Sequence, residues 1–167
     1  MMPTTHASPI TPDLVAFLRS HFVLDWHGIH GANHWARVKL NGLLLAAETG
    51  ADAHVVELFA FLHDSCREDD GHDLTHGGRS AQLVGTLRDE RLIRVSDTQH
   101  EWLVDACRRH SDGELEAPLT VQVCWDADRL DLGRVGIRPA AHRLCTEAAR
   151  RPEVIRAAYA RSLGRKG

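Results

Sequence analysis

Apolar residues recur at every third or fourth position along most of this chain, a spacing that places them on one face of an α-helix. No stretch alternates apolar and polar residues with the period of two that is typical of a half-buried strand. The pattern predicts eight helices, at about residues 12–24, 32–49, 52–66, 76–90, 98–110, 118–132, 138–150 and 152–163. We therefore expect an all-α fold, a helical bundle of about seven to eight helices.

Residues that favour helix ends lie at these boundaries. Thr11 is a typical N-cap before a proline in the first turn, and Gly50 follows the second predicted helix, where a glycine is common. Turn-forming residues dominate segment 67–75, with the sequence REDDGHDLT, so we expect a surface loop there. Residues 1–10 lack a periodic pattern, which predicts a flexible leader, followed by a single domain over residues 11–167.

The composition indicates one globular domain. The chain has 167 residues and a mass of 18.6 kDa, with 43% of its residues hydrophobic and 26% charged. No apolar run approaches the roughly 20 residues needed to cross a bilayer, and the first residues lack the charged and apolar regions of a secretion signal. We therefore expect a cytoplasmic protein. Its four cysteines form no CxxC motif, which favours reduced thiols over a disulfide framework.

Charge is unevenly distributed along the chain. Residues 134–167 hold nine basic and two acidic side chains, although the whole chain has a formal net charge of −3. Such a basic segment can bind nucleic acid, but its arginines are spread over predicted helices without interleaved aromatic residues. We interpret it as a solvated arginine-rich face and predict no nucleic-acid partner. The sequence leaves the oligomeric state open, with a homodimer as one option.

One carboxylate interrupts an apolar helix face. In the helix expected at 118–132, Asp128 lies on the same face as Trp125. A buried carboxylate without a partner is costly, so Asp128 needs a cation, and either a metal ion or a buried arginine would serve. Asp126 and Asp131 point elsewhere on the helical wheel, and we expect both to be solvated.

Histidine is abundant, with 12 copies, and several imidazoles occupy positions where a core residue is expected. These positions are His34, His63, His76 and His110, and Asp64 stands beside His63. Each histidine alone could be a hydrogen-bonded core residue. With Asp128 they place ligand-type side chains on five predicted helices, which favours a metal site over independent coincidences. Imidazole and carboxylate without thiolate suit Mn, Fe, Co, Ni or Zn in a catalytic site.

The order of these residues resembles the metal-binding signature of the HD-domain superfamily, which is named for an adjacent histidine and aspartate. Matching segments occur in order over about residues 27–140: HWARV from His34, FLHDS from Phe61, HGGRSA from His76, the pair His110-Ser111, and DADRLDLGRVG around Asp128. The resemblance implies an HD fold and a divalent metal held by His34, His63, Asp64 and Asp128. His76 and His110 match the extra ligands of two-metal members, so it implies one ion or two.

The resemblance also implies hydrolysis of a phosphate ester. The expected function is that of a metal-dependent phosphohydrolase acting on a small phosphorylated compound, with a nucleotide as one option. Two alternatives stay open: a di-iron oxygenase, which needs all six ligands, and a non-catalytic sensor of metal or nucleotide. Arg109 precedes His110 in place of a second histidine, and no glycine-tyrosine-proline extension is present, so we do not expect a cyclic-dinucleotide phosphodiesterase.

Four residues near the predicted ligands are candidates for a catalytic role. Asp64 could position the attacking water as well as bind metal, and Glu68 could orient or deprotonate that water. Arg37 and Arg67 could bind phosphate oxygens through their guanidinium groups. The alternative for either arginine is a structural ion pair, and the alternative for Glu68 is a solvated position in the acidic loop.

Overall fold

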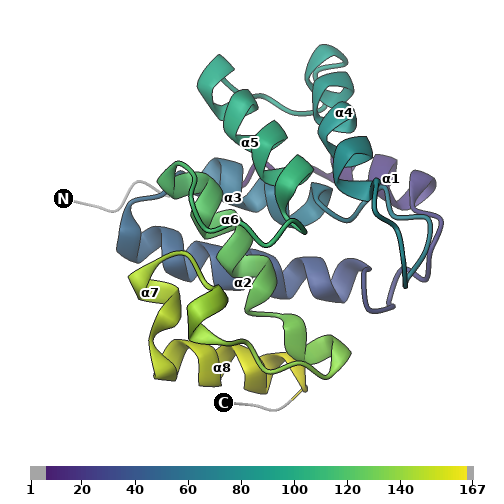
Figure 1. Cartoon of the computed structure of the whole chain (residues 1–167). Helices are drawn as coiled ribbons and strands as arrows, with labels where there is room; N and C mark the ends of the chain where they lie inside the picture. Colours follow the sequence, from purple (N-terminus) through teal and green to yellow (C-terminus); the bar gives the residue numbers. More distant parts are fainter. Residues whose placement is uncertain (1–6, 165–167) are drawn as a thin grey trace.

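The computed structural model describes residues 7–164, which form eight α-helices and two short 3-10 helices with no strand among them (Figure 1). The α-helices are α1 (Pro12–His21), α2 (Ala32–Thr49), α3 (Ala53–Leu62), α4 (His76–Asp89), α5 (Asp97–Arg109), α6 (Leu119–Arg129), α7 (Glu147–Arg150) and α8 (Pro152–Ser162). The 3-10 helices are η1 (Leu132–Val135) and η2 (Ala141–Arg143). The prediction of an all-α fold is confirmed.

Helix α2 lies at the centre of the arrangement. It packs against α3 and α6, while α4 and α5 form a pair on one side of this group and α7 and α8 lie on the other (Figure 1). Gly42 permits the close contact between α2 and α3, because a Cβ at this position would lie 2.3 Å from Cγ1 of Val56. Trp35, Phe59 and Trp125 are fully buried by this packing. The core therefore occupies the space around α2, α3 and α6.

Helices α1, α3 and α6 end three or four residues before their predicted ends, and one predicted helix is largely absent. Helix α6 ends at Arg129, and the helix predicted at 138–150 is present only as the short elements η2 and α7. The carboxylate of Asp126 explains the second difference, because it accepts the backbone N–H groups of Cys145 (2.6 Å) and Thr146 (2.8 Å). These bonds hold the chain before α7 in an extended conformation, and the Thr146 side chain then caps α7.

The prediction that Asp126 and Asp131 are solvated is wrong, because both side chains are fully buried. Helix α6 is enclosed by α2, α3 and α5, and the chain that follows it covers a further side. Asp131 lies beyond the last turn of α6, so a helical wheel continued to residue 132 gives its direction incorrectly. Both carboxylates are satisfied by hydrogen bonds, as burial of a charged group requires.

The start of the described chain is docked on the domain. Residues 1–6 of the predicted leader lie outside the described residues. Ser8 donates a hydrogen bond to Oε2 of Glu57 on α3 (2.6 Å), and Ile10 packs against the core. Ser8 and Ile10 therefore contact the domain, and the flexibility of the leader stays a prediction.

Two expectations from the composition also concern the structure. The four cysteines are free thiols, as predicted, and Cys107, Cys124 and Cys145 are buried. Within residues 7–164, no helix combines the length and the apolar character that a membrane crossing requires.

Candidate metal centre

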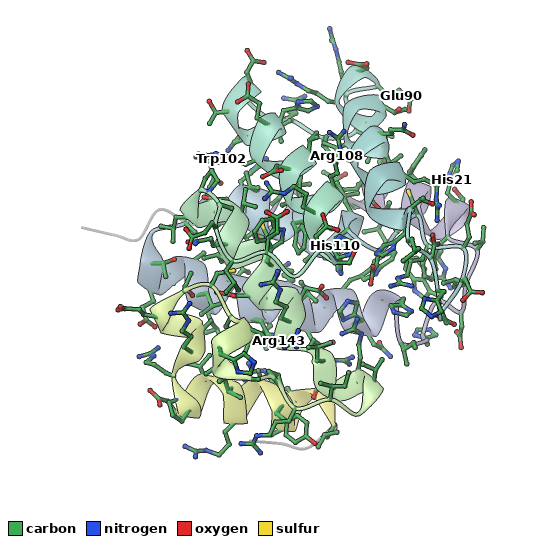
Figure 2. All side chains as sticks on the ribbon, in the orientation of Figure 1. His21, Glu90, Trp102, Arg108, His110 and Arg143 are labelled. Atoms are coloured by element: carbon green, nitrogen blue, oxygen red, sulfur yellow. The ribbon has the colours of Figure 1, made fainter. Side chains whose placement is uncertain are left out.

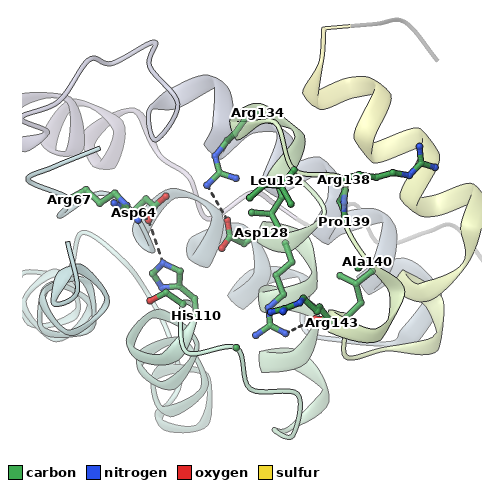
Figure 3. A pocket seen from close by; sticks show the side chains of 15 residues that line it. Asp64, Arg67, His110, Asp128, Leu132, Arg134, Arg138, Pro139, Ala140 and Arg143 are labelled. Atoms are coloured by element: carbon green, nitrogen blue, oxygen red, sulfur yellow. Dashed lines mark hydrogen bonds and ion pairs between the residues drawn. The ribbon is translucent and has the colours of Figure 1, made fainter. Parts of the chain in front are cut away.

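Six imidazole and carboxylate side chains meet in one buried group, which we call the His–Asp cluster. They are His34 in the first turn of α2, His63 and Asp64 at the end of α3, His76 at the start of α4, His110 at the end of α5, and Asp128 in the last turn of α6. The four imidazoles are at most 5% exposed. Figure 2 shows His110 inside the molecule, and Figure 3 shows it facing Asp64. The structure thus brings together all six predicted ligands.

Asp64 lies between two pairs of imidazoles. Its Oδ2 atom is 3.4 Å from Nε2 of His34 and 3.4 Å from Nε2 of His63. Its Oδ1 atom is 3.3 Å from Nε2 of His76 and 3.4 Å from Nε2 of His110. Each oxygen of this carboxylate therefore faces a different pair of imidazoles.

Hydrogen bonds fix the tautomer of three imidazoles. Nδ1 of His63 donates to the backbone oxygen of Phe59 (3.0 Å), and Nδ1 of His110 donates to that of Cys107 (2.7 Å). Nδ1 of His76 donates in the same way to the backbone oxygen of Asp73. A carbonyl can only accept, so Nδ1 carries a proton in each of these rings, and each Nε2 faces the cluster and can bind a metal ion through its lone pair when the ring is neutral.

The fourth imidazole is oriented by a buried carboxylate that sequence reasoning missed. Nδ1 of His34 donates to Oδ2 of Asp131 (2.7 Å), and Oδ1 of Asp131 accepts a hydrogen bond from Nε of Arg37 (2.7 Å). Asp131 thereby fixes the ring orientation of His34 and makes it more basic. Arg37 is engaged in an ion pair behind the cluster and does not line the cavity beside it. The only signal in the sequence was the position of Asp131 three residues after Asp128.

The distances within the cluster fit divalent metal ions. Nε2 of His34 lies 3.1 Å from Nε2 of His63, and Nε2 of His76 lies 2.8 Å from Nε2 of His110. Lone pairs at these distances repel each other unless a cation or a proton lies between them. Bonds of about 2.1 Å to one ion place neighbouring ligand atoms about 3.0–3.4 Å apart, in octahedral or tetrahedral geometry. The 3.1 Å separation lies within this range and the 2.8 Å separation lies just below it, so both are close to what a transition metal requires.

Asp128 supplies a second indication of a cation site. Its Oδ1 atom is buried and accepts no hydrogen bond within the described residues. The same atom lies 3.3 Å from Nε2 of His34 and 3.4 Å from Nε2 of His63, so one cation could contact all three atoms. A buried carboxylate oxygen without a donor is costly in a folded protein, and a metal ion would satisfy it.

The electrostatics of the cluster favour positive charge. Burial by itself would lower the pKa of His63, but the carboxylates of Asp64 and Asp128 outweigh burial and raise this pKa to about 10. Burial would raise the pKa of both carboxyls, yet the neighbouring imidazoles, with His63 first, hold each pKa well below its usual range. Both carboxylates are therefore anionic at neutral pH and able to bind a cation.

Gly77 permits the approach of two of these imidazoles. A Cβ at this position would lie 2.7 Å from the backbone oxygen of Arg108 and 2.8 Å from that of Cys107. The first turn of α4 can thus touch the last turn of α5, which carries His110 to His76. A residue with a side chain would hold the two helices apart.

A cavity of about 360 Å³ opens onto the cluster at Asp64, His110 and Asp128 (Figure 3). Two arginines stand beside these carboxylates: Nε of Arg67 donates to Oδ1 of Asp64 (3.2 Å), and Nη2 of Arg134 lies 3.9 Å from Oδ1 of Asp128. Other nitrogens of both guanidinium groups donate to backbone carbonyls. In each case Nη2 makes no hydrogen bond within residues 7–164, so it is available to a ligand. Arg67 was a sequence candidate, whereas Arg134 was not.

The structure does not bring Glu68 to the cluster. Glu68 is exposed, does not line this cavity, and has its Oε1 atom 3.8 Å from Nε of Arg79 on α4. Asp73 sets this loop geometry, because its carboxylate accepts the backbone N–H of Glu68 (2.8 Å) and a bond from Nη2 of Arg79 (2.5 Å). The prediction that Glu68 orients the water therefore has no geometric support, and the solvated alternative describes its position.

Comparison with known proteins adds no relative to this description. Neither protein-family profiles, nor curated proteins, nor solved structures include a match to the chain, so its assignment depends on the geometry of the His–Asp cluster.

Proposed function

We propose that this chain is an HD-domain protein that acts as a metal-dependent phosphohydrolase on a small phosphorylated compound. The observation that carries the proposal is the His–Asp cluster, in which four imidazoles direct their Nε2 atoms toward the shared carboxylate of Asp64. This donor set suits Mn, Fe, Co, Ni or Zn. A nucleotide is one substrate within the class, and the free cysteines agree with a cytoplasmic location.

The cluster divides into two ligand sets. His34, His63, Asp128 and Oδ2 of Asp64 would hold one ion, and His76, His110 and Oδ1 of Asp64 would hold a second. A divalent ion in such a site polarises a phosphoryl oxygen and lowers the pKa of water.

The chain's own residues would bind and orient the substrate. Arg67 and Arg134 flank the cluster, and each has a free Nη2 group that can donate to a phosphoryl oxygen. Their other nitrogens donate to protein oxygens, and Nη2 of Arg134 also faces Oδ1 of Asp128, so the guanidinium groups are pre-organised for charge that develops on a phosphoryl group during hydrolysis. This pair of arginines supports a phosphate ester as the substrate.

Metal content and phosphate release test the proposal together. We expect one or two Mn, Fe, Co, Ni or Zn ions per chain, and release of phosphate from at least one member of a panel of phosphomonoesters, phosphodiesters and nucleotides. A chelator and the Asp64→Asn variant should both abolish release. Asp112→Asn is the matched control, because Asp112 is exposed and its carboxylate has no partner among the described residues. Full activity in metal-free protein would contradict the proposal.

A di-iron oxygenase is the second candidate, because the cluster holds six potential ligands and the two oxygens of Asp64 face different pairs of imidazoles. The same preparation separates the two functions. Two irons per chain with consumption of dioxygen, and no phosphate release from any ester, would favour the oxygenase. A metal-loaded protein that shows neither reaction would favour a sensor.

A further inference from the structure

The cavity beside the His–Asp cluster is lined by more positive side chains than the binding of one phosphate group requires. The residues that line this cavity include five arginines and two carboxylates, namely Arg67, Arg129, Arg134, Arg138, Arg143, Asp64 and Asp128. The carboxylates lie at the cluster, where Arg67 and Arg134 face them. Arg129, Arg138 and Arg143 form no ion pair with any residue in the part of the chain that the structure describes.

Arg129 is the last residue of α6, and Arg138 and Arg143 belong to the segment that follows this helix. The guanidinium group of Arg129 is fixed, because it donates to the backbone oxygens of Glu114 (2.7 Å) and Arg143 (3.0 Å). That of Arg138 lies over the ring of Tyr159, 5.4 Å from its centroid. The side chain of Arg143 makes no hydrogen bond to any residue in 7–164. Arg143 is therefore the positive group that is most available to a ligand.

Arg143 is separated from the arginines that face the carboxylates. Figure 3 shows Arg134 and Arg143 on opposite sides of Asp128. The cavity surface includes the apolar side chains of Leu132, Ile137 and Leu144. The cavity thus offers two positive regions and an apolar surface, within a volume of about 360 Å³ that suits a small molecule.

The charges decide what such a cavity can bind. A phosphate monoester carries about two negative charges at neutral pH, and Arg67, Arg134 and the cluster would suffice to bind it. Arg129 and Arg143 would then stay uncompensated beside an apolar surface, where a positive potential attracts a further anion.

We propose that the substrate carries a second anionic group, a phosphate or a carboxylate, which binds at Arg143 and Arg129 while its phosphate ester lies at the His–Asp cluster. The inference rests on the proposed function, because that function places the ester at the cluster. The substrate class is a small compound with two anionic groups joined by a partly apolar body.

Binding of phosphonates to manganese-loaded protein tests this inference without turnover. The probes are alkane bisphosphonates with two to six carbons, alkylphosphonates of the same lengths, and phosphonocarboxylates of the same lengths, each titrated by calorimetry. At one chain length we expect the compound with two anionic groups to bind at least about tenfold more tightly than the alkylphosphonate, since a hydrogen bond to a charged group contributes on that scale. If the bisphosphonates show the larger gain in affinity, the second anionic group is a phosphate. If the phosphonocarboxylates show it, the second group is a carboxylate.

Substitution of Arg143 tests whether the gain in affinity from a second anionic group arises from binding at Arg143. Arg143→Ala should remove the preference for two anionic groups and leave alkylphosphonate binding within about threefold, and Arg143→Lys should restore part of the preference. The matched control is Arg156→Ala on α8, which removes the same charge at an exposed position outside the cavity. Because Arg143 is exposed and its side chain has no bonded partner among residues 7–164, the variant should fold normally.

The outcomes separate this inference from the proposed function. If alkylphosphonates bind but no second anionic group improves binding, or if the gain persists in Arg143→Ala, the inference fails and the proposed function stands. If no phosphonate binds to metal-loaded protein, both fail.

Discussion

Gly77 is the position at which one added methyl group should separate two imidazoles of the cluster. A Cβ there would lie 2.7 Å from the backbone oxygen of Arg108 and 2.8 Å from that of Cys107. Both oxygens belong to the last turn of α5, so they can move only with the helix that carries His110. We expect Gly77→Ala to push α4 away from α5 and to lengthen the 2.8 Å distance between Nε2 of His76 and Nε2 of His110.

The size of the effect follows from these contacts. Nine in ten real Cβ contacts are longer than 3.4 Å, so the helices must separate by about 0.7 Å at Gly77. Overpacking of this kind costs about 1–3 kcal/mol, and the better helix propensity of alanine offsets about 0.5–1 kcal/mol of it. We expect the free energy of unfolding to fall by about 1–2 kcal/mol. A displacement above about 0.5 Å also exceeds what a metal site tolerates, so the set of Asp64, His76 and His110 should lose its ion.

The neighbouring glycine provides a matched control. A Cβ at Gly78 would meet no atom within 4 Å, so Gly78→Ala should leave stability unchanged or raise it by up to about 1 kcal/mol. Urea unfolding of both metal-free variants measures stability, and metal analysis of both loaded variants measures ions per chain. If Gly77→Ala equals Gly78→Ala in both measurements, the close contact between α4 and α5 does not position the imidazoles, and the reasoning is refuted.

Further expectations concern the ligands and their surroundings. His63→Ala should lose bound metal but retain its helical circular dichroism, and retention of the full metal content would show that the cluster is not a metal site. Asp131→Asn should weaken metal affinity by about 10–100-fold, because it removes the carboxylate that orients His34, and competition with a chelator measures this change. Because the carboxylates raise the pKa of His63 to about 10, metal must displace a proton, and affinity should rise about tenfold per pH unit near neutrality, measured by titration at several pH values. Glu68→Gln should change kcat by less than about twofold, since Glu68 is exposed beside Arg79, and a 100-fold loss would return it to the mechanism.

The ligands could be predicted from the sequence because they break a pattern that the core imposes. His63 and Asp128 occupy helix faces that should be apolar, and each therefore signals a partner at that position. Helix periodicity also placed the helices that carry them within a few residues of their observed ends. A polar residue at a position that helical spacing assigns to an apolar face can be recognised from its neighbours along the chain, so a single sequence is enough to detect it.

The residues that surround the cluster could not be predicted, because they lie in turns and loops beyond the ends of the helices. Asp131 and Arg134 follow the end of α6 at Arg129, and their directions are set by the turn there, which a helical wheel does not describe. Glu68 was misplaced for a related reason, since Asp73 and Arg79 hold its loop through contacts that no periodicity encodes. Contacts formed by loops depend on residues distant along the chain, and these were visible only in the fold.

The six ligands come from five helices, α2 to α6, and a metal ion bound by them would cross-link positions as far apart as His34 and Asp128. The unfolded chain cannot hold these side chains together, so metal binding would add directly to folding stability, by about 2.7 kcal/mol when the free ion is at 100 times its dissociation constant. Such a gain lowers the unfolded fraction about 100-fold, and proteases degrade mainly unfolded chains. The supply of metal in the cell would thus govern the lifetime of this protein as well as its chemistry.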